Sequence, residues 1–146
     1  MTQVQGLQQT SPGNFWWVGL QTIVGAVIAT LVVRATAMAI LDIPAAFPPL
    51  AGPGPTLFFT VVGVLGGVGV FAAVCRVASQ PIRLFRIIVA VALLVSFVPD
   101  ILLLTSDAFP GTTVASVSTL MFQHVVAAAI VAWMLTMQGR RERAAA

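Results

Sequence analysis

Three ionisable residues, Arg34, Asp100 and His124, stand within long apolar stretches of this 146-residue sequence. A charge inside a membrane costs about 2.5–3.5 kcal/mol even on insertion scales, so such residues usually face the interior of a helix bundle and find a partner. An arginine can hold an anionic group, and an acid and a histidine can exchange a proton. We therefore treat the three as one intramembrane polar cluster and a candidate ligand or proton site.

The depths of these residues suggest which of them could pair. A rise of 1.5 Å per residue along a helix puts Arg34 roughly 10 Å, Asp100 about 6 Å and His124 about 16 Å below the external face. Arg34 and Asp100 are then close enough to form an ion pair, whereas His124 lies deeper, near the midplane. We favour an ion pair that fixes helix packing over an open pocket on the external side.

Two alternatives concern the partners of the cluster. In the ion-pair interpretation, His124 donates to a backbone carbonyl, to Ser96 or to Thr30. In a third interpretation, Arg34 extends outward along its long side chain and pairs with Asp42.

The composition indicates the elements that carry these residues. Hydrophobic residues make up 59% of the chain and charged residues 8%, with a mean hydropathy of +1.04, which is typical of an integral membrane protein and not of a soluble domain. We predict an all-α, four-span transmembrane helix bundle forming one membrane domain, 1–146. The expected segments are a disordered tail at 1–14, spans at about 16–41, 57–78, 84–104 and 113–137, and a basic tail at 138–146.

The arginines predict the orientation. Those outside the apolar cores gather on one side of the expected topology, opposite Asp42 and Asp107, and they are Arg76, Arg83, Arg86, Arg140, Arg141 and Arg143. The positive-inside tendency then makes both termini cytoplasmic in the cell's inner (plasma) membrane. All of these except Arg76 are candidates for lipid headgroup anchoring. The basic charge is a topology signal, so no nucleic-acid partner is expected.

Helix packing is predicted from glycine and proline. Gly63 and Gly67 have the spacing that lets two membrane helices approach closely, so we expect a homo-oligomer through this face. Pro99 cannot donate a backbone hydrogen bond, and we expect a kinked but continuous helix there.

The residues for other chemistry are few. With one His and one Cys in the chain, no metal site and no cofactor is expected, and haem ligation by His124 would need a dimer. No nucleophile with a base and an orienting acid can be assembled by spacing, so no catalytic residue is assigned and an enzyme is the less favoured class. Packing is the simplest role for Cys75, ahead of acylation.

Three segments carry a family resemblance: PPLAGPGPTLFFTVVGV, RLFRIIVAVALLVSFVPD and HVVAAAIVAWMLT. The chain resembles a family of small, uncharacterised bacterial four-helix integral membrane proteins known only as a domain of unknown function. The resemblance implies a four-span fold and a recurrent Pro99, Asp100 and His124. It supplies no mechanism.

These observations lead to three functional hypotheses. The first is an accessory or structural membrane protein with a polar cluster on its external side. The alternative is a small proton-linked carrier or channel that uses Asp100 and His124. The third is a membrane-embedded enzyme with a cofactor that no sequence motif indicates. Access of water to the cluster separates the carrier from the structural protein.

Overall fold

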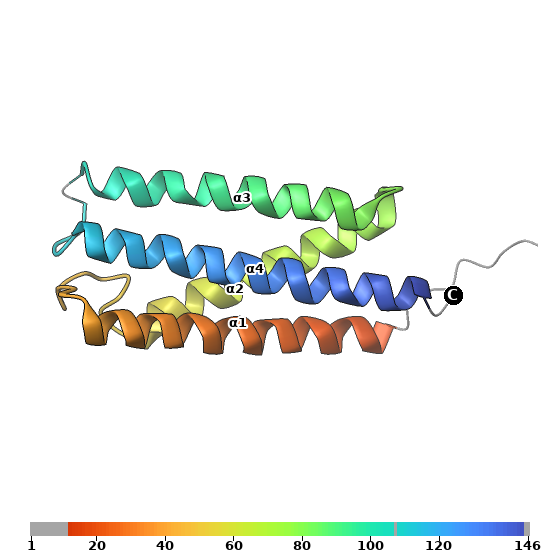
Figure 1. The fold of residues 1–146 in the computed structure, drawn as a ribbon, viewed down its shortest axis with the longest axis horizontal. Helices are drawn as coiled ribbons and strands as arrows, with labels where there is room; N and C mark the ends of the chain where they lie inside the picture. The colour runs from red at the N-terminus through yellow and green to blue at the C-terminus, as the bar shows by residue number, and fades with distance from the viewer. Residues whose placement is uncertain (1–11, 107, 145–146) are drawn as a thin grey trace, which may run out of the picture.

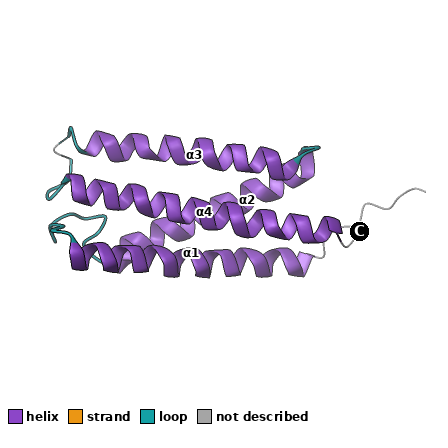
Figure 2. Cartoon of the chain, viewed as in Figure 1, coloured by secondary structure: helices purple, strands orange, loops and turns teal. Residues whose placement is uncertain are grey.

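The fold is a bundle of four long helices. The computed structural model describes residues 12–106 and 108–144, and it describes side-chain surroundings for 15–106 and 108–137. The helices are α1 (Pro12–Ile40), α2 (Pro53–Val77), α3 (Pro81–Leu103) and α4 (Val114–Ala144) (Figure 1). Figure 2 shows only helices and loops across this described part of the chain.

All four helices are long and apolar enough to cross a membrane. The qualifying segments are Phe15–Ile40, Pro53–Val77, Pro81–Leu103 and Val114–Met137. At 1.5 Å per residue each exceeds the hydrocarbon thickness of about 30 Å. The prediction of an all-helical chain with four membrane-compatible helices is confirmed.

Prolines set two of the helix starts. The helix α2 begins at Pro53 rather than near 57, and α3 begins at Pro81 rather than near 84. Proline favours the first helical turn because its missing N–H would have no intrahelical partner there and its φ is already helical. At the other end of the chain, α4 continues to Ala144 through most of the expected basic tail. Of the expected N-terminal tail, residues 12–14 are helical and 1–11 lie outside the described residues.

The helix α4 is the centre of the arrangement. It contacts all three other helices, as α2 also does, whereas α1 and α3 do not contact each other. Figure 1 shows α4 between α1 and α3, with α2 crossing diagonally behind them. The start of α1 and the end of α4 lie at the same end of the bundle.

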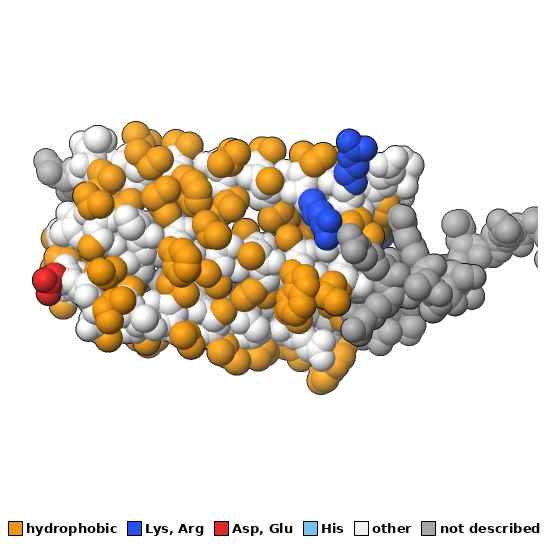
Figure 3. All heavy atoms as spheres, viewed as in Figure 1, with side chains coloured by type: hydrophobic (Ala, Val, Ile, Leu, Met, Phe, Trp, Pro, Cys, Tyr) orange, Lys and Arg blue, Asp and Glu red, His pale blue; other side chains and the backbone are white. Residues whose placement is uncertain are grey.

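The two ends differ in charge. We call the end where α2 ends and α3 begins, with Arg76, Arg83 and Arg86, the basic end, and the opposite end, with Asp42, the acidic end. Figure 3 shows basic and acidic side chains at these opposite ends and hydrophobic side chains along the length between them. This pattern suits a protein surrounded by lipid.

Apolar packing fills the half of the bundle toward the basic end. The rings of Phe71 and Phe85 meet edge to face with centroids 4.9 Å apart. On α1, Thr22, Ala26 and Thr30 recur every four residues and are at most 1% exposed, because small side chains let neighbouring helices approach. The buried cluster comprises Val18, Ala26, Val64, Val68, Phe71, Val74, Phe85, Val131 and Leu135.

The proline-rich loop between α1 and α2 closes the acidic end. It folds back so that Ile43, Phe47 and Leu50 become buried. Gly111 in the other loop of this end has φ +74°, and a Cβ there would lie 3.0 Å from Pro44 Cβ and 3.1 Å from the Phe47 nitrogen. Only glycine fits such a left-handed position at this distance. The two loops are therefore packed together.

The predicted glycine pair is divided between two environments. A Cβ at Gly67 would lie 2.9 Å from Val131 Cγ1 of α4, so this glycine serves packing within the bundle. A Cβ at Gly63 would meet nothing within 4 Å. Gly63 thus faces away from the chain's own helices.

Candidate functional site

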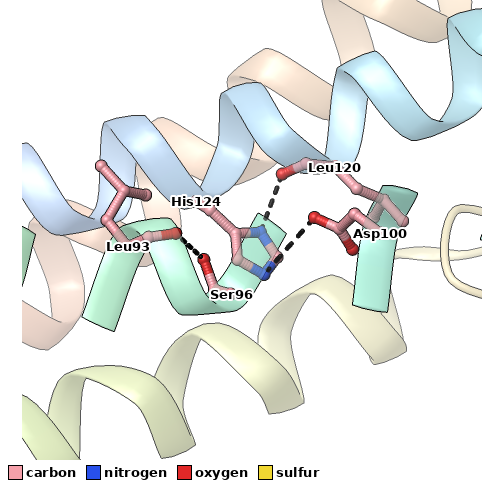
Figure 4. Close-up of polar contacts among 5 residues, drawn as sticks. All are labelled: Leu93, Ser96, Asp100, Leu120 and His124. Atoms are coloured by element: carbon pink, nitrogen blue, oxygen red, sulfur yellow. Dashed lines mark hydrogen bonds and ion pairs between the residues drawn. The ribbon is translucent and has the colours of Figure 1, made fainter. Parts of the chain in front are cut away.

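Asp100 and His124 face each other across the contact between α3 and α4. The distance from His124 Nε2 to Asp100 Oδ2 is 3.9 Å, and the side chains are 39% and 9% exposed, respectively. Figure 4 shows the imidazole and the carboxyl group pointing toward one another. The carboxyl group is buried, and the imidazole is its more accessible partner.

A hydrogen bond defines the protonation of the histidine ring. His124 Nδ1 lies 2.8 Å from the Leu120 carbonyl oxygen. Because a carbonyl oxygen can only accept, Nδ1 carries the hydrogen and donates it. In the neutral ring Nε2 then presents a lone pair toward Asp100, whose Oδ2 is buried without a hydrogen-bond partner.

The local structure of α3 holds Asp100 in this position. The helix continues through Pro99 to Leu103, so Asp100 remains on a regular helical face. One turn earlier, the Ser96 hydroxyl donates to the Leu93 carbonyl at 2.7 Å, and Figure 4 shows Ser96 beside the imidazole. Continuity of the helix through Pro99 agrees with expectation, and the kink itself stays a prediction.

Arg34 has a different partner from those expected. Its Nε and Nη2 donate to the Leu50 carbonyl at 3.2 and 2.8 Å. Within the described residues it makes no ion pair with Asp100 or Asp42. The expected Arg34–Asp100 pair is wrong, because α4 separates α1 from α3.

The depth estimate failed for a related reason. It assumed that all helices end in one plane, which placed Asp100 level with Arg34 and well above His124. The structure instead places His124 Nε2 3.9 Å from Asp100 Oδ2, because the estimate followed helix axes and left out the reach of the two side chains, which lean toward the N-termini of their helices. The structure brings two of the three predicted cluster residues together and gives the third another environment.

Two further buried polar groups escaped the sequence analysis. Thr56 Oγ1 on α2 and Gln123 Nε2 on α4 have no hydrogen-bond partner. Nearby on α1 and α2, the hydroxyls of Thr30 and Thr60 lie 3.1 Å apart. The sequence does hold a clue to Gln123, because it is the only amide side chain in its apolar span. It was missed because it is neutral and only ionisable residues were considered.

The basic residues have separate roles. Arg83 and Arg86 are exposed near the start of α3, and Arg86 Nη2 donates to Thr136 Oγ1 on α4 at 3.3 Å. The side chains of Arg140, Arg141 and Arg143 lie outside the described residues. Lipid headgroup anchoring by these arginines stays a prediction.

The Asp100–His124 pair belongs neither to a metal-binding group among the described residues nor to a large cavity. The described residues contain no group of three His, Cys, Asp or Glu side chains that could hold a metal. A cavity of about 360 Å³ opens at the acidic end between Leu103, Phe109 and Thr112, and neither Asp100 nor His124 lines it. The site is therefore a contact between two side chains and not a wide pocket.

The comparisons with known proteins identify a family but no activity. No curated protein and no solved structure matches the chain. A family of unknown function, DUF6069, matches residues 10–141. This stretch includes all four membrane-compatible helices and every residue of the site. The resemblance to an uncharacterised family is thereby confirmed, and the chain belongs to the DUF6069 family.

Proposed function

We propose that this protein is a small proton-linked carrier that binds its proton between Asp100 and His124. The observation that carries the proposal is the approach of His124 Nε2 to Asp100 Oδ2, at 3.9 Å, with Nδ1 already committed to the Leu120 carbonyl. Two acceptor atoms then face each other in a region where polar groups are costly to bury. A single added proton supplies the missing donor.

The proton can reside on either partner. On Asp100 it makes the carboxyl group a donor to Nε2, and on His124 it makes Nε2–H a donor to the carboxylate. In both cases the contact must shorten from 3.9 Å to about 2.7–3.0 Å to form a hydrogen bond. Uptake of the proton is thus accompanied by closer approach of α3 and α4.

The two partners differ in exposure. His124 is 39% exposed at its side chain and Asp100 only 9%, so the imidazole is the more accessible partner of the shared proton and the carboxyl group is the enclosed one. A histidine and an acid within a membrane commonly form such a relay.

The first test uses the fact that the chain contains one histidine. Nitrogen-15 labelling of histidine gives NMR signals from His124 alone, without assignment by mutagenesis. We expect the Asp100→Asn variant to change the chemical shift of Nε2, because the group that faces this nitrogen is altered. The chemical shift of Nδ1, which donates to the Leu120 carbonyl, should stay the same.

Proton movement is measured separately in vesicles containing the protein and a pH-sensitive dye. We expect proton flux in the parent protein and at least a tenfold loss in Asp100→Asn and His124→Gln. Thr22→Val is the control, because Thr22 is a buried residue whose hydroxyl donates to the Val18 carbonyl, away from the pair. Equal flux in all four proteins, or an imidazole that does not respond to Asp100→Asn, would contradict the proposal.

The orientation belongs to the same proposal. Arg76, Arg83 and Arg86 at the basic end support a cytoplasmic location of that end and of both termini, in the plasma membrane of a bacterium. The proton site would then lie nearer the external face. The variants Ala45→Cys and Ser79→Cys are each made in a background with Cys75→Ser. Their reaction with an impermeant thiol reagent in intact cells tests this orientation.

A second candidate function is an accessory or structural protein that acts as a homo-oligomer. The observation that favours it is the outward position of Gly63, which meets none of the chain's own atoms within 4 Å. If Gly63 contacts a second copy, Gly63→Ala should weaken self-association by roughly 1 kcal/mol, as overpacking does. Energy transfer between labelled copies in vesicles measures this, and unchanged transfer would assign Gly63 to the lipid.

A further inference from the structure

Arg34 carries a positive charge that the described chain does not balance. Of its five N–H donors, Nε–H and one on Nη2 are directed to the Leu50 carbonyl. No carboxylate makes an ion pair with it among the described residues. Because an unbalanced charge within a membrane is costly, its remaining three N–H groups are available for an anion from outside the chain.

Thr56 lies at the same level of the bundle as Arg34. The hydroxyls of Thr30 on α1 and Thr60 on α2 are 3.1 Å apart and fix the register of these two helices. Arg34 and Thr56 each lie four residues from that contact toward the acidic end, which is one turn, or about 6 Å, along the same helical face. Thr56 is 4% exposed, and its Oγ1 has no hydrogen-bond partner.

Gln123 lies at this level on α4. A Cβ at Gly25 of α1 would be 3.7 Å from Met134 Sδ and 4.0 Å from Ile130 Cγ2, which fixes the register of α1 and α4. The two helices are antiparallel, and Arg34 lies nine residues beyond Gly25. Nine residues back along α4, counted from midway between Ile130 and Met134, lies Gln123. Gln123 is 7% exposed, and its Nε2 is unpartnered.

The chemistry of these groups is that of an anion site. The guanidinium and the amide nitrogen of Gln123 can only donate, and the Thr56 hydroxyl can donate. Thr56 also lies in the first turn of α2, whose N-cap Gly52 provides no side-chain hydrogen bond, so the positive end of this helix is uncapped. The helix that carries Asp100 does not contact α1, the helix that carries Arg34.

We infer that Arg34, Thr56 and Gln123 form a binding site for one small monovalent anion, either a halide or a short carboxylate. A small ion is specified because Thr56 and Gln123 are only 4% and 7% exposed, and a larger anion would have to displace the side chains packed around them. In a carrier of the kind proposed above, this anion crosses with the proton. Only that coupling rests on the proposed function.

Thermal unfolding of the purified full-length protein in detergent, followed by tryptophan fluorescence, tests the site. Sodium chloride and sodium acetate are compared with sodium gluconate at equal ionic strength and fixed pH, since gluconate is too large for the site. We expect chloride or acetate to raise the unfolding temperature with a saturating dependence on concentration. A response to chloride identifies a halide site, and a response to acetate alone identifies a carboxylate site.

Matched variants locate the binding. Gln123→Met and Thr56→Val keep the side-chain volume and the Arg34–Leu50 contact, and each should weaken anion binding about tenfold through loss of a hydrogen bond to a charge. Arg34→Gln should abolish it. Thr22→Val should retain the parent affinity, because its hydroxyl is already bonded to the Val18 carbonyl.

The outcomes separate this site from the proton site. Asp100→Asn should retain anion binding even where it loses proton flux, and in that case the two sites are distinct. The inference is overturned if the three salts stabilise the parent equally, or if Gln123→Met and Thr56→Val bind with the parent affinity. It is also overturned if Asp100→Asn abolishes anion binding, because the carboxyl group would then belong to the same site.

Discussion

The two halves of the bundle are packed by different means. Toward the basic end, the core consists of aliphatic and aromatic side chains, and its buried threonines Thr22 and Thr136 donate to carbonyls of their own helices. Toward the acidic end, Thr56, Asp100 and Gln123 each bury an atom without a partner. A membrane helix gains little from burying polar atoms unless they are satisfied. The comparison teaches that the half toward the basic end satisfies the buried hydroxyls of these threonines, whereas the half toward the acidic end leaves three buried polar atoms without a partner, and the proposed sites lie there.

Removing a buried ring from the apolar half toward the basic end should lower stability most. Phe85→Ala removes a fully buried ring that packs on Phe71 and should lower the free energy of unfolding by about 3 kcal/mol. Unfolding in mixed micelles measures the loss. Phe58→Ala is the matched control, because Phe58 is 61% exposed and should change stability by less than about 0.5 kcal/mol. Equal losses from both variants would show that the apolar core does not dominate stability.

A smaller loss is expected at the loops of the acidic end. Gly111→Ala places a side chain at φ +74° against Pro44 and Phe47 and should cost about 2 kcal/mol. Gly54→Ala is the control, since a Cβ there meets nothing within 4 Å and Gly54 lies in a helix. Hydrogen exchange of residues 41–52 should increase in Gly111→Ala alone. Unchanged protection would mean that the two loops are not coupled.

Replacing the buried amide of Gln123 should change stability only slightly, but the sign of the change is informative. In gluconate, where no small anion is present, Gln123→Met should leave stability unchanged or raise it by up to about 1 kcal/mol, because it removes a buried donor without a partner. Thr22→Val should instead lower stability slightly, by about 0.5 kcal/mol, since it removes a satisfied hydroxyl. Denaturant titration of both variants measures the signs. A destabilised Gln123→Met would show that the amide has a partner within the protein.

The fold could be predicted because its determinants are local. Four apolar runs, each separated by proline or polar residues, define four helices, and arginine positions define two distinct ends. The boundaries shifted where prolines begin helices at 53 and 81, because proline suits a first turn as well as a loop. The burial of Phe47 and Leu50 could not be predicted, since a proline-rich loop gives no periodic pattern to indicate what it packs against.

The candidate site could be predicted in its members but not in its contacts. Arg34, Asp100 and His124 stand out because each is ionisable within an apolar run. Their pairing depends on which helices are neighbours and on the offset between their ends, and a single sequence does not specify either property. Arg34 therefore donates to the Leu50 carbonyl and Asp100 faces His124, in place of the expected pairing of Arg34 with Asp100. Thr56 and Gln123 were missed because neutral polar residues were not considered.

The central position of α4 has a mechanical consequence. Gln123 and His124 are adjacent residues of this helix, about 100° apart around its axis, and they belong to the two proposed sites, whose helices α1 and α3 do not contact each other. A rotation of α4 that brings the imidazole closer to Asp100 must also turn the Gln123 amide relative to Arg34. Rotation of α4 as a rigid body would thus couple the two proposed sites, without any change in the backbone conformation of the helix.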